Sequence, residues 1–308
     1  MTAYNVADFI GTAIQSALAQ TFKDFELIVV DDGSTDNTVE MVARNSDPRL
    51  FLERRSHQGA AAQMRRGAEL SQTPYLAFLD ADDLWDPLKL ERHVEFLDRH
   101  PEVDLTFSWS RMIDERGSDT GLTTRLWNGP LSFDELLADN VIGNGSALVL
   151  RREALAAAGG IDSTLEACYD LDAWLRVALL RPGNVCAIPE FLTSYRRRRG
   201  QMTGDVEIME RSFHRVVEKA RKLAPGAVSR IEQRSRCNMQ RFFAYSCYQA
   251  GDYATSARRL AHAFRRAPAT FLSDFRNWKM SGAALAGLIL SPRFHQCLMR
   301  TVLKPRRA

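Results

Sequence analysis

The stretch YLAFLDADDLWDP, residues 75–87, begins as a short apolar strand and ends among four acidic residues. An earlier stretch, FELIVVDDGSTDNT at residues 25–38, has the same order, an apolar run followed by acids. A short, continuous apolar run is typical of a strand that is buried on both faces. Carboxylates crowded at a strand end repel each other, so core formation alone does not explain them. The two acidic clusters therefore indicate a binding site at the ends of two strands.

Helix and strand patterns alternate along the first part of the chain. Apolar residues at helical spacing predict a helix after Asn5, which could cap it. Further strands are expected at 49–54 and 75–79, and further helices at 59–70 and 87–100. This alternation predicts an α/β fold with a mostly parallel sheet. Ligands bind beyond the carboxyl ends of such strands, so both acidic clusters are expected to face one crevice.

The character of the sequence changes near Asp205. The chain from there on is rich in Arg and Ala and has no convincing strand pattern. We therefore expect an α/β domain over residues 1–204 and an α-helical region over 205–308. Residues 242–268 have spacings like those of one tetratricopeptide repeat. Such repeats stack in threes or more, so a helical hairpin packed on the first domain is the favoured interpretation.

The composition excludes several classes of protein. Of the 308 residues, 45% are hydrophobic and 26% charged, and the net charge of +3 is too balanced to indicate a nucleic-acid binder. The five cysteines form no C-x-x-C pair, so neither a disulfide framework nor a zinc cluster is indicated, and a cytoplasmic location is expected. No apolar run approaches the roughly 20 residues that cross a bilayer.

Clustered carboxylates at a strand end have three common uses. They bind a hard metal ion, they accept hydrogen bonds from a sugar or a base, or they are simply solvated. Asp80 and Asp82 form a D-x-D pair that suits Mg²⁺ or Mn²⁺, which often bind one or two carboxylates together with substrate phosphates.

Four segments carry a resemblance to a known family. QTFKDFELIVVDDGSTDNT, YLAFLDADDLW, AAGGID and YDLDAWLRV occur in an order and spacing that resemble family 2 glycosyltransferases of the GT-A fold, over residues 2–203. The resemblance implies a Rossmann-like sheet flanked by helices and the inverting transfer of a sugar from a nucleoside diphosphate. The expected donor is a UDP-sugar, with dTDP- and GDP-sugars as alternatives. The expected acceptor is a glycan or a lipid-linked precursor in bacterial surface polysaccharide synthesis.

The resemblance also implies roles for residues of the donor site. Thr2 and Tyr4 would contact the nucleoside, Tyr4 by stacking on the base, and Asp32 would accept the base N–H. Asp80 would lie at the ribose, and Asp82 would ligate the Mn²⁺ or Mg²⁺ ion held by the diphosphate.

The resemblance makes Asp170 the general base that takes the proton of the acceptor hydroxyl. From the residues alone, Asp170 and Asp172 would be expected only to cap a helix. With the family pattern, Asp170 is the expected base and Asp172 is expected to be structural.

The chain departs from the family pattern at several positions. Family members begin with an apolar strand, whereas only Met1 precedes Thr2 here, which predicts a missing first strand. A start that lies upstream is the favoured explanation, and a sheet that closes differently is the alternative. Met64 replaces an Arg of the family, which puts one basic contact to the diphosphate in doubt. Arg198 replaces a His, and since Arg cannot ligate a metal but binds phosphate well, Arg198 is an expected diphosphate contact. A solvated basic loop is the alternative.

Two other functions compete with sugar transfer. A sugar-phosphate nucleotidyltransferase would open with a Gly-rich basic loop, which this sequence lacks. A non-catalytic nucleotide-sugar binder or scaffold is a second alternative, and the presence of Asp32, Asp80, Asp82 and Asp170 together argues against it. The basic stretch LSPRFHQCLMRTVLKPRR, residues 290–307, suggests peripheral contact with the inner face of the plasma membrane, with a soluble helical tail as the alternative.

Overall fold

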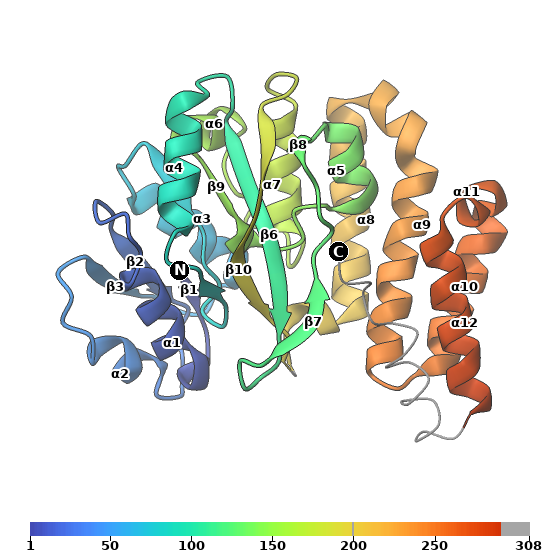
Figure 1. The fold of residues 1–308 in the computed structure, drawn as a ribbon, viewed down its shortest axis with the longest axis horizontal. Helices are drawn as coiled ribbons and strands as arrows, with labels where there is room; N and C mark the ends of the chain where they lie inside the picture. The colour runs from blue at the N-terminus through green and yellow to red at the C-terminus, as the bar shows by residue number, and fades with distance from the viewer. Residues whose placement is uncertain (199, 291–308) are drawn as a thin grey trace.

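The computed structural model describes residues 1–198 and 200–290, and Figure 1 shows their arrangement. Two sheets lie next to each other, and a group of helices forms the end of the molecule opposite the smaller sheet (Figure 1). The smaller sheet is parallel, in the order β1-β2-β3, with bounds Thr2–Ala3, Leu27–Asp31 and Leu50–Arg54. The helices of this part are α1 (Ala7–Leu18), α2 (Thr38–Ala43) and α3 (Ala60–Leu70).

The larger sheet is mixed and has the order β4-β9-β6-β10-β5, with bounds Tyr75–Ala77, Leu148–Arg151, Leu105–Ile113, Val185–Arg196 and Leu84–Trp85. Two short strands flank it, β7 (Asp119–Thr123) beside β6 and β8 (Gly129–Pro130) beside β10. The two long strands β6 and β10 are parallel, and the strands added around them are antiparallel. Helices α4 (Lys89–Arg99), α5 (Phe133–Asp139), α6 (Arg152–Ala157) and α7 (Tyr169–Ala178) accompany this sheet. The expected strands and helices of the first 100 residues are thereby confirmed to within a few residues.

Where the sequence predicts a missing first strand, the structure has a strand of only two residues, β1. Thr2 pairs with Val30 of β2, and an isolated parallel bridge joins Thr2 to Asp80 on the other side. The amino group of Met1 donates to the Ile28 carbonyl at 2.7 Å, and burial lowers its pKa to about 6. A strand of only two residues thus bridges the two sheets, and it satisfies backbone groups that an absent strand would leave unpaired.

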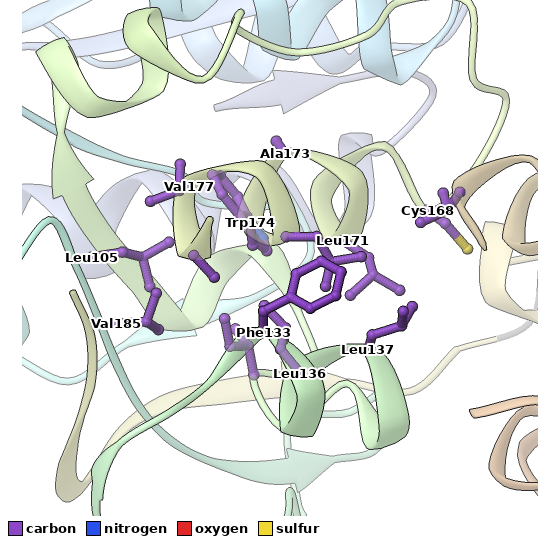
Figure 2. Packing of buried hydrophobic residues seen from close by; sticks show 14 of the residues in the cluster. Leu105, Phe133, Leu136, Leu137, Cys168, Leu171, Ala173, Trp174, Val177 and Val185 are labelled. Carbon is purple, nitrogen blue, oxygen red and sulfur yellow. The ribbon is translucent and has the colours of Figure 1, made fainter. Parts of the chain in front are cut away.

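A large apolar core fixes the position of α7. Trp174, Leu171 and Val177 of α7 pack with Leu136 of α5 and with Leu105 of β6, as Figure 2 shows. Trp174 and Leu136 are almost completely buried. Burial of large side chains on both sides of α7 holds the helix rigidly, and with it the acidic residues of its first turn.

The C-terminal helices are α8 (Val206–Leu223), α9 (Pro225–Gln249), α10 (Tyr253–Arg266), α11 (Pro268–Leu272) and α12 (Phe275–Ile289). The expected helical hairpin is present as the second half of α9 and α10. Phe213 and Val217 of α8 join the same core as α7, whereas Leu260 of α10 and Ala284 of α12 belong to a separate small core. Secondary structure therefore changes at residue 205, but the main core continues through α8. No helix among the described residues combines the length and the apolar character that crossing a membrane requires.

Candidate functional site

Both acidic clusters lie against β1. The Asp32 N–H donates to the Ala3 carbonyl at 2.8 Å, and Thr2 forms its bridge with Asp80. Asp80 follows β4, and Asp32 follows β2, so the carboxyl ends of these strands converge as the sequence predicts. The short first strand is therefore the element that connects the two halves of the site.

The carboxylate of Asp32 is held by neutral donors from one turn. It accepts hydrogen bonds from the backbone N–H groups of Gln58 at 2.7 Å and Gly59 at 2.9 Å, and from the side-chain amide of Gln63. Gly59 has φ +93°, a conformation that favours glycine and lets both N–H groups point at one acid. Asp32 is almost fully buried, so its position is fixed by the start of α3.

Tyr4, His57 and Asp32 form one unit. The rings of Tyr4 and His57 stack with centroids 4.3 Å apart, and Nδ1 of His57 lies 2.9 Å from the Asp32 carboxylate. Tyr4 is 44% exposed, so its ring is accessible at this edge. His57 is an exposed loop residue, with 57% of its side chain accessible, and only the fold brings it onto Asp32.

The D-x-D segment is held by arginines at the end of β10 and just after it. The Nε of Arg198 donates to a carboxylate oxygen of Asp82 at 2.6 Å, and the Nε of Arg196 donates to the Asp82 carbonyl at 2.7 Å. Both guanidinium groups also lie over the ring of Phe9, at 5.2 Å for Arg196 and 5.3 Å for Arg198. Arg198 thus contacts the very acid that the resemblance makes the metal ligand.

The other acids of this segment have supporting contacts. Asp83 is fully buried and accepts hydrogen bonds from Ser146 Oγ at 2.6 Å and from the Arg196 N–H at 2.8 Å. Asp86 accepts from the Leu88 N–H at 3.0 Å, just before α4. Asp83 thus supports the loop through these contacts, and Asp86 lies just before the start of α4.

Asp80 is influenced by two acids from different segments. Burial first, and then the charges of Asp82 and Asp170, raise its pKa to about 7. Tyr195 of β10 lies close enough that the charges of Asp83 and Asp80 add to the effect of burial in raising its pKa. Three carboxylates, Asp80, Asp82 and Asp170, therefore belong to one site although 90 residues of chain separate the first from the last.

Asp170 and Asp172 have different surroundings in the first turn of α7. Asp170 accepts a hydrogen bond from the Leu171 N–H at 2.8 Å, and burial raises its pKa. Asp172 is buried between Arg176, at 2.8 Å, and Lys219 of α8, also at 2.8 Å. Asp172 is therefore committed to an ion-pair network, whereas Asp170 has no cationic partner among the residues that the structure describes.

The residues fit a divalent cation that is shared with a diphosphate, and they do not fit a closed protein cage. No group of three or more His, Cys, Asp or Glu side chains within the described ranges could hold a metal by itself. Asp80 and Asp82 offer carboxylate oxygens at one place, as Mg²⁺ and Mn²⁺ require, and phosphates would have to complete the coordination. A cation at Asp82 would also have to replace Arg198.

Basic residues of α3 are directed elsewhere. Arg65 pairs with Glu69, and Arg66 pairs with Glu53 of β3. Met64, at the position of the family's Arg, is buried in the core. The basic groups in contact with the D-x-D segment thus come from Arg196 at the end of β10 and from Arg198 just after it.

Comparison with known proteins agrees with this arrangement. The model of the family described as Glycosyl transferase family 2 matches residues 1–158. An uncharacterised protein of Mycobacterium tuberculosis is 33% identical over 201 residues, which cover 63% of this chain and 56% of that protein. The UDP-Glc:alpha-D-GlcNAc-diphosphoundecaprenol beta-1,3-glucosyltransferase WfaP of Escherichia coli is 32% identical over 117 residues, 38% of this chain and 45% of that enzyme. The chain spans about half the length of the curated relatives it matches.

Solved structures share the fold. S. aureus TarS 1-349 in complex with UDP-GlcNAc matches 98% of this chain and 88% of its own, with a TM-score of 0.63 and 16% identity. The mannosyltransferase PcManGT from Pyrobaculum calidifontis, in complex with GDP-Man and Mn²⁺, matches 98% of this chain and 83% of its own, with a TM-score of 0.56 and 21% identity. These likenesses show the GT-A fold. With more than half of its residues matched by the family model, the chain belongs to glycosyl transferase family 2.

Proposed function

We propose that this protein transfers a sugar from a nucleoside-diphosphate sugar to a hydroxyl group of a glycan or lipid-linked acceptor, with inversion at the anomeric carbon. The observation that carries the proposal is the meeting of Asp80, Asp82 and Asp170 beside the unit of Tyr4, His57 and Asp32. On this proposal, the nucleotide and the reacting groups would bind along one edge of the fold.

The nucleoside would bind at the smaller sheet. The exposed ring of Tyr4 offers a stacking surface for the base, and the fixed carboxylate of Asp32 offers an acceptor for a base N–H. Thr2 lies between them and Asp80, where the ribose would follow. UDP is the proposed nucleotide, with dTDP and GDP as alternatives.

The diphosphate would lie at Asp82 and Arg198. Asp82 would hold a Mn²⁺ or Mg²⁺ ion, which supplies charge neutralisation for the departing diphosphate. Arg198 is close enough to exchange its partner, leaving the Asp82 carboxylate for a phosphate oxygen. The Phe9 ring under Arg198 keeps the guanidinium at this edge during the exchange.

Asp170 is the proposed general base. Its raised pKa makes it a better proton acceptor than an ordinary surface Asp, and the rigid α7 holds it in place. The acceptor oxygen would lose its proton to Asp170 as it attacks the anomeric carbon from the face opposite the diphosphate. A single displacement of this kind inverts the configuration.

The relatives support this chemistry. The E. coli relative is named for a UDP-glucose donor and a diphosphoundecaprenol-linked acceptor, and the two structural neighbours are described with UDP-GlcNAc and with GDP-Man and Mn²⁺. We accordingly propose a role in bacterial surface glycan synthesis at the cytoplasmic face of the membrane, with no nucleic-acid partner. The residues 1–204 would carry the reaction, and the helices after residue 205 would support acceptor binding.

A second candidate function is nucleotide-sugar binding without turnover. The ion pair of Arg198 with Asp82 favours it, since an acid held by an internal cation could remain closed to metal. Measurement of turnover separates the two functions.

The test uses a panel of UDP-, dTDP- and GDP-sugars with Mn²⁺, and measures both hydrolysis and the shift in melting temperature. We expect one nucleotide class to stabilise the protein and one of its sugars to be hydrolysed. Asp170→Asn should lower turnover by about 10² to 10⁴ fold with nucleotide binding unchanged. Asp82→Ala should remove turnover together with its metal dependence.

Asp86→Asn is the matched control, because Asp86 belongs to the same acidic stretch but only accepts a hydrogen bond from the Leu88 N–H in the turn before α4, which an Asn oxygen can also accept. The variant should keep full turnover. Nucleotide binding without any hydrolysis or transfer would contradict the proposal and leave the binding protein as the function.

A further inference from the structure

The outermost helix of the C-terminal region, α12, packs on its neighbours through small side chains. Met280, Ala283 and Ala284 are buried against α9 and α10. At Gly287 a Cβ atom would come within 2.6 Å of the ring of Tyr253, so α12 and α10 approach as closely as glycine permits. Figure 1 shows these helices at the end of the molecule that is opposite β1–β3.

The large apolar residues of α12 lie on the opposite side. Phe275, Trp278, Leu285 and Ile289, here called the outer row, recur at the three- and four-residue spacing of one helix face and are exposed by 75%, 53%, 53% and 79%. The indole N–H of Trp278 donates to the Leu272 carbonyl at 3.1 Å, which leaves the ring as an apolar surface. A helix of a soluble domain normally turns its large apolar residues inward. The reverse distribution marks an interaction surface.

The charge of this end indicates what covers the outer row. In the described part of this end, residues 253–290 contain six basic residues and one acidic residue, whereas residues 1–252 contain 30 basic and 37 acidic residues. Lys279 follows Trp278 on α12, and Arg265 and Arg266 end α10. Among the described residues, none of these three has an acidic partner within 4 Å. A strongly basic end with an exposed apolar row is complementary to an anionic, amphipathic surface.

We propose that the outer row of α12 inserts into the interfacial layer of an anionic phospholipid membrane, with the helix lying along the surface. The basic residues of 253–290 would attract the headgroups, and the rings of Phe275 and Trp278 would enter the boundary between headgroups and acyl chains. A second copy of the chain is disfavoured as the occupant, because the contact would bring two strongly basic ends together. The proposal does not depend on the sugar-transfer reaction, so either can fail alone.

The test is flotation of the full chain with vesicles of phosphatidylcholine, with and without 30% phosphatidylglycerol. We expect at least tenfold more bound protein with the anionic vesicles, and loss of most binding at 0.5 M salt. The double variant Phe275→Ser/Ile289→Ser should lose at least tenfold of the binding. Phe51→Ser is the matched control, since Phe51 of β3 is 50% exposed at the opposite end, and it should bind as the parent does.

A local readout identifies the inserted surface. Vesicles with brominated acyl chains should quench part of the tryptophan fluorescence of the parent, and Trp278→Phe should remove that part. Equal flotation of the parent and the double variant would overturn the proposal, because binding would then come from basic residues alone. Absence of vesicle binding, together with a dimer in sedimentation that the double variant dissociates, would also overturn it in favour of a second copy.

Discussion

The two acidic clusters at the edge of the sheets are held in different ways. Asp32 is fixed by the side-chain amide of Gln63 in α3 and by two backbone N–H groups, which cannot move without unfolding the turn. Asp82 is paired with the guanidinium of Arg198, a long side chain that follows the end of β10. The first carboxylate is part of the architecture, and the second has a partner that can be exchanged.

This difference fits the parts of the donor that each cluster would contact. A base is recognised by hydrogen-bonding groups in fixed positions, because a base of the wrong kind leaves some of those groups without a partner. A diphosphate with its cation brings several charges at once, which a mobile cation can accommodate. Asp80 lies between the two clusters, partly buried, and its charge is disfavoured by the neighbouring acids Asp82 and Asp170.

The largest expected effect concerns Asp80. Burial and the charges of Asp82 and Asp170 raise its pKa from 3.8 to about 7, so the native state binds this proton more tightly than the unfolded chain. The contribution to stability is therefore complete below about pH 4 and is lost as pH rises through 7. Between pH 5 and 7.5 the free energy of unfolding should fall by about 2 to 3 kcal/mol more in the parent than in Asp80→Asn.

Urea unfolding of both proteins at the two pH values measures this difference. Asp86→Asn serves as the control, because Asp86 belongs to the same stretch but accepts a hydrogen bond from Leu88 in the turn before α4. Parallel pH dependence of the parent and Asp80→Asn would show that Asp80 is not the acid that repels its neighbours.

The next effect tests the fixed cluster. Asp32→Asn replaces one acceptor oxygen by an N–H₂ group, which would face the N–H of Gln58 or Gly59. We expect the free energy of unfolding to fall by about 2 kcal/mol, since hydrogen bonds to a buried charge are lost and a donor is left unpaired. Urea unfolding checks the loss, and titration with UDP should show weaker nucleotide binding.

Asp31→Asn is the neighbouring control. Asp31 is equally buried, but its Oδ1 has no hydrogen-bond partner among the described residues, and its other oxygen accepts from the Ser34 N–H. An amide at position 31 removes few hydrogen bonds, so we expect the free energy of unfolding to change by less than about 1 kcal/mol. Equal losses in the free energy of unfolding for Asp31→Asn and Asp32→Asn would mean that both acids are simply buried. The hydrogen bonds from the turn would then give Asp32 no special stability.

The strands that lead into the two clusters could be predicted from the sequence, whereas the long-range contacts of Asp32 and Asp82 could not. The strands before Asp32 and Asp80 are local apolar runs, and the convergence of their ends follows from parallel strand order. The contacts of Asp32 with His57 and of Asp82 with Arg198 depend on the packing of segments 25 and 116 residues apart. Local periodicity carries no information at that range. The two-residue β1 is likewise set by its two neighbouring strands, because its own sequence is too short to have a strand pattern.

The smallest expected effect tests whether the partner of Asp82 is exchangeable. Arg198→Ala removes the guanidinium from the Asp82 carboxylate and also removes the proposed phosphate contact. We expect two opposite changes in affinity, each of about tenfold, which corresponds to about 1.4 kcal/mol. Mn²⁺ alone should bind more tightly, because no internal cation competes for Asp82, and UDP without metal should bind more weakly.

Calorimetric titration of Mn²⁺ and of UDP, each alone, separates the two changes. Arg197→Ala is the matched control, since the guanidinium of Arg197 lies over the ring of Tyr245 in α9, 5.6 Å from its centroid. That variant should change neither affinity by more than about twofold, because its charge contacts neither Asp82 nor the proposed diphosphate. If Arg198→Ala left both affinities unchanged, Asp82 would have to be regarded as a fixed carboxylate like Asp32. The two clusters would then differ only in which groups bind their carboxylates.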